Sequence, residues 1–229
     1  MINIVYEDND LLVCIKPAGV PSQPGLNREV DMTTILQNYL NDKKDGSEIG
    51  LVHRLDRNVG GVMVFSKNKK TTGKLSDTIR NRKFAKEYLT VVHNCPGEST
   101  GVFKDLLFKD TSKNKTYVVK RLRKGVKQAS LEYQVLGTQN SPSGVISLVK
   151  VGLHTGRTHQ IRVQFASRKL PLVGDGKYGS RDNRWDIALW SYRLSFKHPA
   201  NGEEIDIMQN PPNMYPWNLF ELDLDGDGQ

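Results

Sequence analysis

Residues 84–93 read FAKEYLTVVH and begin the part of the sequence that decides the fold class. Aromatic and β-branched side chains dominate this segment, as is typical of a β-strand. Four further strand-like segments follow after short gaps: GVFKDLLFKD (101–110), TYVVKRL (116–122), ASLEYQVLG (129–137) and GVISLVKVGL (144–153). Such a succession of strands favours an α+β protein with a largely antiparallel, mixed β-sheet and flanking helices over alternating βαβ units.

The segments before this run supply the remaining predicted elements. They are a hairpin at NIVYED (3–8) and LLVCIKP (11–17), a buried strand at GGVMVFSK (60–67), and helices at TTILQNYL (33–40) and KKTTGKLSDTIRN (69–81). No interior stretch has the composition of a linker, so we expect one domain over residues 1–218. Residues 219–229 form an acidic segment, which we expect to be a disordered tail.

Length and composition indicate a soluble protein. The 229 residues, 37% of them hydrophobic, suffice for one large domain or two small ones. No apolar run approaches the roughly 20 residues of a membrane helix, and the start MINIVYEDND lacks the pattern of a signal peptide. We therefore expect a cytoplasmic protein. Cys14 and Cys95 are expected to be buried, reduced thiols rather than a disulfide or a metal site.

Positive charge is concentrated in one segment of this basic protein, whose net charge is +8 and whose pI is near 9.4. Residues 109–127 hold one acid, Asp110, and eight bases: Lys109, Lys113, Lys115, Lys120, Arg121, Arg123, Lys124 and Lys127. RNRKFAK (80–86) adds four more bases. This distribution favours a polyanionic partner such as nucleic acid, although a solvated basic hairpin would have the same composition.

Metal and nucleotide chemistry have weaker support. His53, His154 and His159 lack the spacing of a zinc motif. The tail DLDGDGQ (223–229) begins like a calcium loop but stops before the later ligands that such a loop requires. The glycine patterns of phosphate-binding loops and dinucleotide turns are missing from the sequence. We therefore expect no metal and no cofactor.

Two stretches remain as candidates for a functional site. GLVHRLDRNVGGVMVFSK (50–67) places one carboxylate, Asp56, between Arg54 and Arg57. A lone acid flanked by bases is usually a solvated surface loop. The residues alone do not distinguish that loop from a reactive carboxylate.

The second stretch is VGLHTGRTHQIRVQFA (151–166), in which a strand and a Thr-Gly turn precede a segment of helical spacing. Ile161 and Phe165 would face the core, and Arg157 would lie in the first helical turn. The helix dipole disfavours a cation there, so Arg157 needs a partner, and Asp56 is the candidate. A purely structural ion pair would look the same in the sequence.

These two stretches resemble the signatures of RluA-type pseudouridine synthases. HRLDRNVGG is similar to the His-Arg-Leu-Asp signature of that family, and GRTHQIRV is similar to its later Gly-Arg-Thr-His-Gln-Leu-Arg-Val block. Shorter blocks agree in the same order: YEDNDLLVCIKPAGVPSQP, KEYLTVV, PLVGDGKYG and LSFKHP. The resemblance covers nearly the whole chain up to its tail. It implies the pseudouridine synthase fold, with an active-site cleft.

The resemblance also implies a reaction, the isomerisation of uridine within RNA to pseudouridine without a cofactor. Asp56 corresponds to the catalytic carboxylate, which either adds to the sugar or removes a sugar proton as the glycosidic bond breaks. Arg157 corresponds to an arginine that pairs with this carboxylate and favours its charged form. Tyr88 corresponds to an active-site tyrosine that stacks on the target uracil; otherwise it is ordinary strand packing.

By the same resemblance, Arg54 fills the gap left when the target nucleotide is flipped out of its stack. Gly60 and Gly61 would let the backbone turn tightly beneath the site. The other expected substrate-binding residues are basic or lie in the second motif: Arg57, Lys86, His159, Arg162, Lys120, Arg121, Arg123 and Lys124.

The sequence departs from the family pattern in two places. After the Asp the family usually has Thr-Ser-Gly, where this chain has Val59, Gly60 and Gly61. Loss of two hydroxyls is expected to loosen this loop. Before the final strand, Trp190 stands where the family often has a histidine, and we expect it to replace that residue in packing.

The expected partner is ribosomal or transfer RNA, and the chain is expected to act as a monomer. It begins directly at the strands of the catalytic domain, like family members that lack a small basic RNA-binding domain. Two rival interpretations stay open. One is a noncatalytic RNA-binding protein in which Asp56 is dispensable, and the other is a metal-dependent nuclease that uses Asp56 and His53.

Overall fold

The computed structural model describes residues 2–25, 29–182 and 184–222. The chain forms two compact units, each assembled from two stretches of sequence. Unit 1 consists of Met1–Glu87 and Trp190–Gln209, and unit 2 of Tyr88–Leu189 and Asn210–Gln229. The single domain over residues 1–218 stays a prediction. Residues 223–229 of the expected tail lie outside the described residues.

Unit 1 is built on a mixed sheet with the strands β1 (Asn3–Glu7), β2 (Leu11–Lys16), β3 (Gly50–Leu51), β4 (Gly60–Ser66), β10 (Leu189–Lys197) and β11 (Glu204–Met208). The central order is β1-β2-β4-β10. Strand β1 pairs with β2 and β2 pairs with β4, both antiparallel, whereas β4 and β10 are parallel. Strand β3 pairs with β4, and β11 pairs with β10, both antiparallel.

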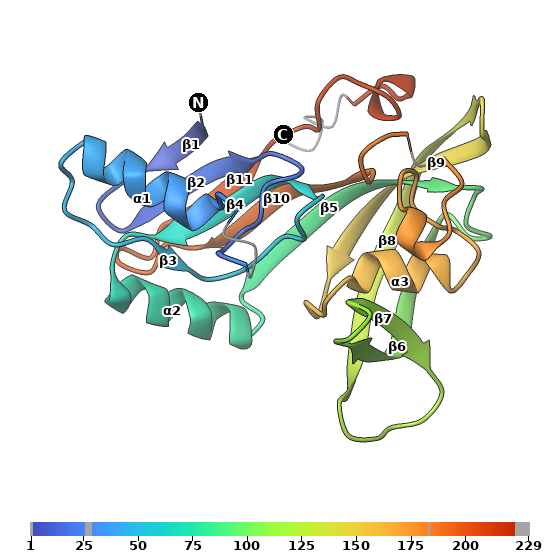
Figure 1. The fold of residues 1–229 in the computed structure, drawn as a ribbon, viewed down its shortest axis with the longest axis horizontal. Helices are drawn as coiled ribbons and strands as arrows, with labels where there is room; N and C mark the ends of the chain where they lie inside the picture. The colour runs from blue at the N-terminus through green and yellow to red at the C-terminus, as the bar shows by residue number, and fades with distance from the viewer. Residues whose placement is uncertain (1, 26–28, 183, 223–229) are drawn as a thin grey trace. The chain divides into compact units, whose positions relative to one another are not determined.

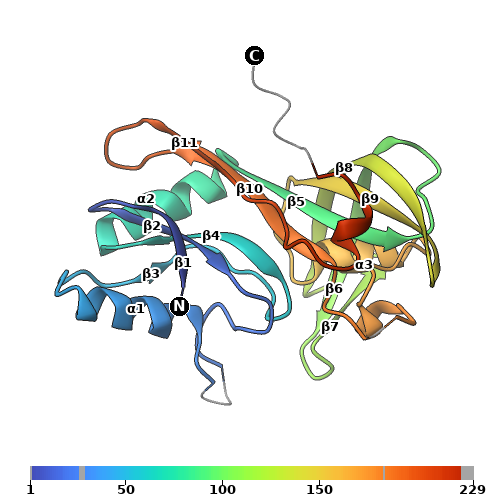
Figure 2. The same ribbon diagram turned by 90° about the horizontal axis from the view of Figure 1, so that it is seen from above.

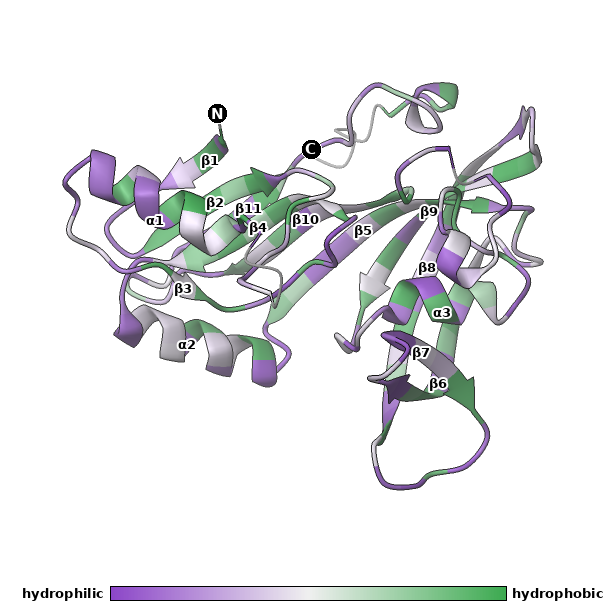
Figure 3. Ribbon diagram, viewed as in Figure 1, coloured by the Kyte–Doolittle hydropathy of each residue, from purple (hydrophilic) through white to green (hydrophobic). Residues whose placement is uncertain are grey.

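Two helices cover opposite faces of this sheet, α1 (Met32–Asp42) and α2 (Lys69–Arg80) (Figures 1 and 2). Helix α1 begins where the Asp31 carboxylate accepts the backbone N–H groups of Thr33 and Thr34. Because both faces are covered, every residue of β4 is buried. The hydropathy colouring of β2 and β4 in Figure 3 agrees with this central position.

The core of unit 1 lies between the sheet and α2. Leu11 and Val13 of β2 and Leu75 of α2 belong to one buried cluster. The rings of Phe84 and Phe196 stack within it, with centroids 4.6 Å apart. Phe84 is the first residue of β5 (Phe84–His93), a strand that begins in the sequence of unit 1 and ends in that of unit 2.

Unit 2 contains the strands β6 (Thr100–Asp110), β7 (Lys115–Val119), β8 (Val126–Ser141) and β9 (Gly144–Leu153). With β5 they follow the order β5-β9-β8-β6-β7. The pairs β9–β8, β8–β6 and β6–β7 are all antiparallel. Helix α3 (Gln160–Ala166) packs on this sheet, where the ring of Phe165 lies 5.1 Å from that of Phe103 and 5.9 Å from that of Tyr133.

The predicted α+β class and the largely antiparallel sheet are confirmed. Three details of the prediction are wrong. The strand predicted over 116–122 ends at Val119, where the run of bases begins. Cys95 is exposed, whereas Cys14 is buried as predicted. Arg157 lies before α3 rather than in its first turn. In the described part of the chain, no helix has both the length and the apolar character needed to cross a bilayer.

Candidate active site

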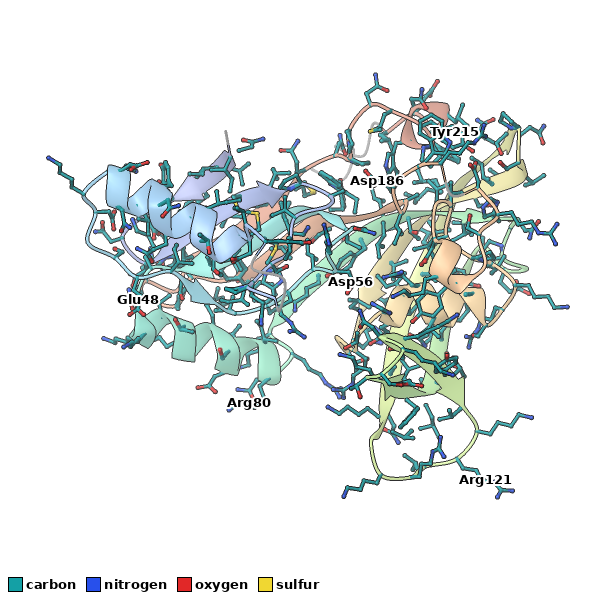
Figure 4. The ribbon with its side chains drawn as sticks, viewed as in Figure 1. Glu48, Asp56, Arg80, Arg121, Asp186 and Tyr215 are labelled. Atoms are coloured by element: carbon teal, nitrogen blue, oxygen red, sulfur yellow. The ribbon has the colours of Figure 1, made fainter. Side chains whose placement is uncertain are left out.

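Asp56 lies in a tight turn between β3 and β4 of unit 1. The turn is closed by the N–H of Val59, which donates to the carbonyl oxygen of Asp56 at 3.0 Å. Just before it, Ser22 holds both backbone groups of Leu55: its hydroxyl donates to the Leu55 carbonyl at 2.8 Å and accepts the Leu55 N–H at 3.1 Å. Asp56 itself is half-buried. Figure 4 labels this residue.

The other side of the turn is held by Lys16, whose side chain is fully buried. Its ammonium donates to three carbonyl oxygens, those of Pro17 at 2.8 Å, Val20 at 2.5 Å and Arg57 at 2.9 Å. An ammonium has three donors, so all of them are used. Lys16 therefore ties the end of β2 to the residue that follows Asp56.

Burial lowers the pKa of Lys16 to about 8, and the negative charge of Asp56 opposes this shift. The two side chains are thus close enough to interact electrostatically.

His53 supports the fold of this motif and is neutral. Its Nε2 accepts the backbone N–H of Val64 at 3.1 Å, and its ring lies 5.8 Å from that of Phe84. Burial holds its pKa well below the usual value, and the charge of Lys86 acts in the same direction. Because Nε2 already accepts a hydrogen bond, His53 does not offer this nitrogen to a metal. The part of the chain that the structure describes contains no group of three or more His, Cys, Asp or Glu suited to a metal ion.

Two basic residues of this motif and Lys86 of β5 differ in their surroundings. Arg54 is exposed. Arg57 donates to the carbonyl oxygen of Gly19 at 3.0 Å and pairs with Glu29 at 3.0 Å. Lys86 lies over the ring of Phe84 at 5.3 Å, and burial lowers its pKa to about 8. The roles of these three residues in substrate binding stay predictions.

Gly60 begins β4 directly beneath the ring of Trp190. A Cβ atom at position 60 would lie 2.4 Å from Cζ3 of Trp190 and 3.2 Å from the backbone oxygen of Lys16. Trp190 is itself fixed, because its indole N–H donates to the carbonyl oxygen of Gln209 at 2.8 Å. The two departures from the family pattern are therefore linked, since the indole ring occupies the space that a serine side chain at position 60 would need.

The glycine pair does not form the tight turn that the sequence analysis expects. The turn runs from Asp56 to Val59, and both glycines lie in β4. Gly61 has a φ of +119°, and a Cβ atom there would meet the backbone of Ser191 at 2.3 Å. Close approach of β10, rather than a reversal of the chain, explains both glycines.

In unit 2, Tyr88 is a buried residue of β5, with 6% of its surface exposed. Arg157 is exposed and precedes α3. Its Nε donates to the carbonyl oxygen of Gln128 at 3.1 Å, and its backbone N–H donates to Oε1 of Gln160 at 3.0 Å. Since the helix begins only at Gln160, the helix dipole does not explain the position of Arg157. Its pairing with Asp56 stays a prediction.

Gln160 is the residue that positions Arg157. Its Oε1 also accepts from the hydroxyl of Thr155 at 2.8 Å, and its Nε2 donates to the carbonyl oxygen of Ser130 at 3.0 Å. Only 3% of Gln160 is exposed. A buried amide with both ends hydrogen-bonded holds the Thr-Gly-Arg segment against β8.

His159 and Arg162 make structural contacts within the same unit. Nδ1 of His159 lies 2.9 Å from the hydroxyl of Tyr178, which also accepts the backbone N–H of Thr116 at 2.8 Å. Arg162 is buried and forms a bidentate ion pair with Asp175, at 2.6 Å and 2.9 Å. These interactions do not test the predicted contacts of His159 and Arg162 with substrate, which stay predictions.

Lys120, Arg121, Arg123 and Lys124 lie in the exposed loop 120–125 between β7 and β8, which we call the basic loop. Lys120 and Arg121 fall within the strand predicted over 116–122, but the strand ends at Val119 and these residues belong to the loop. Arg121 projects away from the sheet at the end of this loop (Figure 4). Within the described residues, none of these four bases has an acidic partner. The expected position in solvent is confirmed.

Two residues of this arrangement are missing from the sequence analysis. Lys16 ends the apolar segment LLVCIK. A lysine at the end of a buried strand needs polar partners for its charge, and backbone oxygens are the nearest candidates. Gln160 lies at the start of a helix that is buried on all sides, a position where a polar side chain needs partners.

Comparison with known proteins reveals a family and several relatives. Residues 10–167 match the profile of the family described as RNA pseudouridylate synthase. An uncharacterized RNA pseudouridine synthase of Aquifex aeolicus is 35% identical over 236 residues, which cover 94% of this chain and 72% of the relative. The ribosomal large subunit pseudouridine synthase D of Borreliella burgdorferi is 30% identical over 91% of this chain. The present chain spans only 62% of that second relative.

Solved structures show the same fold. The human RNA pseudouridylate synthase domain containing 4 matches with a TM-score of 0.75 and 23% sequence identity, over 92% of this chain and 88% of its own. The human RNA pseudouridylate synthase domain containing 1 matches with the same TM-score, over 93% and 85%.

We predict that Gly60→Ser lowers the free energy of unfolding by about 1–3 kcal/mol, because the new side chain meets the indole ring of Trp190. The double variant Gly60→Ser, Trp190→His should recover part of that loss, with a coupling of about 1–2 kcal/mol. Urea unfolding of the single and double variants measures both quantities. Gly73→Ser is the control, since a Cβ atom at position 73 meets nothing within 4 Å. Strictly additive effects of the two substitutions would contradict the predicted clash.

We predict that Lys16→Met lowers the free energy of unfolding by about 2 kcal/mol or more, because carbonyl oxygens around the ammonium lose their donor. It should also speed hydrogen exchange of the Val59 amide, whose hydrogen bond closes the Asp56 turn. Lys43→Met replaces a lysine with 46% of its side chain exposed and serves as the control. Unchanged exchange at Val59 in a destabilised Lys16→Met variant would show that Lys16 does not hold the turn.

Proposed function

The chain belongs to the RNA pseudouridylate synthase family, and we propose that it isomerises specific uridines in structured RNA to pseudouridine, with Asp56 as the catalytic carboxylate. The observation that carries this proposal is the Asp56 turn. The backbone on either side of this half-buried residue is held in place, by Ser22 at Leu55 and by the Lys16 ammonium at Arg57. Both motifs of the sequence analysis lie wholly or largely within the range that matches the family.

The reaction conserves all atoms and needs one well-placed carboxylate. The bond between the sugar C1′ and N1 of the base breaks, the base turns, and a bond between C1′ and C5 replaces it. The proton on C5 is lost, and N1 gains one. Asp56 either adds to C1′ or removes a sugar proton as the first bond breaks, and both roles require the ionised form.

The remaining roles follow from the family resemblance and are part of the proposal. Tyr88 stacks on the target uracil, and its hydroxyl assists the transfer of the C5 proton. Arg157 pairs with Asp56 and keeps it ionised. Arg54, which is exposed, fills the gap in the RNA after the uridine flips out.

The proposed substrate is ribosomal RNA in preference to transfer RNA. The support is the name of the Borreliella burgdorferi relative, which refers to the large ribosomal subunit. Phosphate groups of this RNA bind the basic loop, whose four bases face solvent. Such contacts position the RNA and carry little sequence information.

Asp56→Asn is expected to reduce isomerisation at least about 100-fold, to background, while RNA binding stays nearly intact. The amide keeps the shape of the carboxylate but has neither its charge nor its nucleophilicity. Release of tritium from C5-labelled uridine in ribosomal RNA measures the reaction. Asp77→Asn removes a largely exposed carboxylate from α2 and is the matched control.

Three outcomes of this experiment would count against the assignment. Turnover in Asp56→Asn would show that another group does the chemistry, and full loss of wild-type activity in excess chelator would favour the metal-dependent nuclease. An inactive wild type that still binds RNA would favour the noncatalytic RNA-binding protein.

Replacement of Lys120, Arg121, Arg123 and Lys124 by Gln is expected to weaken binding to all RNAs alike. Each lost phosphate contact removes about 0.7 to 0.9 from the slope of log K against log salt, so the slope should flatten by roughly two to three units. Binding titrations at several salt concentrations measure it. The modified position should stay the same, because the proposed catalytic residues are untouched.

The matched control carries the same change in charge on unit 1: Lys43, Lys44, Lys69 and Lys197, all exposed, are replaced by Gln. It should change the slope little, since salt screens long-range effects. An unchanged slope in the basic-loop variant would place the RNA path elsewhere, with residues 80–86 as the next segment to test.

A further inference from the structure

Trp185 is an exposed aromatic residue in a loop of unit 2 that follows η1 (Gly176–Tyr178). Forty per cent of its surface is accessible, which is high for so large an apolar side chain. Its ring lies against that of Tyr215, with centroids 5.0 Å apart and planes inclined by 44°. Figure 4 labels Tyr215 in the segment that returns to unit 2 after β11. Part of the Trp185 ring is therefore exposed to solvent while another part contacts Tyr215.

A hollow of about 790 Å³ lies near this pair: Asp182, which accepts a hydrogen bond from Tyr215, and Arg184, the residue before Trp185, are part of its lining. The lining includes three bases, Lys169, Arg181 and Arg184, all of them exposed. Among the residues that the structure describes, Lys169 and Arg181 have no acidic partner. The hollow therefore offers at least two guanidinium or ammonium groups to an anion.

Asp182 connects the aromatic pair to the hollow. Its Oδ2 accepts from the hydroxyl of Tyr215 at 3.2 Å and from that of Ser143 at 2.8 Å. Its Oδ1 is buried and lacks a hydrogen-bond partner within the described part of the chain, and Nε of Arg184 lies 3.6 Å from it. Only 4% of the Asp182 side chain is exposed, so its charge is directed into the protein. The exposed acid nearest in sequence is Asp186.

We propose that Lys169, Arg181, Arg184, Trp185 and Tyr215 form a second RNA-binding surface, which holds an unstacked nucleotide of a single-stranded segment of the substrate. The base stacks on Trp185, and the flanking phosphates bind the bases that line the hollow. That the ligand is RNA rests on the proposed function. That it is single-stranded rests on the exposed indole, because a base within a duplex has no free face for it.

The chemistry of this surface differs from that of the basic loop. The basic loop offers four charges and one exposed apolar side chain, Leu122, and it contains no aromatic residue of its own, although Arg123 lies over the ring of Phe108 at 4.8 Å. The Trp185 surface combines charge with a stacking platform, the combination by which proteins bind single strands without reading base identity. The hollow, at about 790 Å³, is large enough for a nucleotide, since ligand sites of small molecules usually span about 300–1,000 Å³.

Tryptophan fluorescence tests the proposal directly. The probes are a short single-stranded RNA and the same sequence within a blunt duplex. Trp217 is buried, and Trp190 is half-buried, so Trp185 is the tryptophan most open to a ligand. We expect the single strand to quench wild-type emission and to shield it from acrylamide. The duplex should do neither, and Trp185→Phe should lose the RNA-dependent change.

Variants separate stacking from charge. Trp185→Ala should weaken binding of the single strand about tenfold, whereas Trp185→Phe, which keeps a ring, should recover most of it. The double variant Lys169→Gln, Arg181→Gln should flatten the slope of log K against log salt concentration by about one unit. Met208→Ala removes a side chain of similar exposure in unit 1 and should change neither quantity.

The proposal is overturned if the single strand leaves the emission unchanged, or if Trp185→Ala binds it as well as wild type does. Equal quenching by the duplex, or by uridine monophosphate alone, would also overturn it, because neither supplies an unstacked nucleotide within a strand. Tritium release by the wild type is measured in parallel. Quenching without isomerisation refutes the proposed function and leaves an RNA-binding surface, whereas isomerisation without quenching refutes only the second surface.

Discussion

A buried ammonium must find oxygen acceptors, and that requirement organises unit 1 around Lys16. The side chain has no access to water, so its three protons are shared among the carbonyl oxygens of Pro17, Val20 and Arg57. These oxygens come from two segments that are far apart in sequence. The geometry of the Asp56 turn thus depends on a residue about 40 positions earlier. One buried side chain therefore joins two segments that the sequence keeps apart.

Much of the fold could be predicted because its elements have strong local patterns. The aromatic and β-branched residues of FAKEYLTVVH and the unbroken apolar run of β4 are typical of strands, and every residue of β4 is buried. The helices α1 and α2 could be recognised for a similar reason. The errors arise where tertiary contacts decide. The pattern of TYVVKRL continues past Val119, but the chain there turns back toward β8.

The site was less predictable than the fold, since its geometry comes from long-range hydrogen bonds. Sequence similarity identified Asp56, but only the structure shows that Ser22 and Lys16 hold its turn. Arg157 was assigned to a helix because helical spacing continues through GRTHQIRV. In fact the side chain of Gln160 accepts the Arg157 N–H, so the helix begins three residues later. A pattern of apolar residues carries no information about such a contact.

The close fit between Gly60 and Trp190 has a consequence for how this sequence diverged from its relatives. A serine and an indole cannot occupy the same space, so a chain that carried both would have been strained. If the ancestor had the family's serine and histidine, the shorter path passes through glycine first, which leaves only a small gap. Trp190 could then fill that gap. Packing would favour that order, and a serine at position 60 is strained for as long as the tryptophan remains.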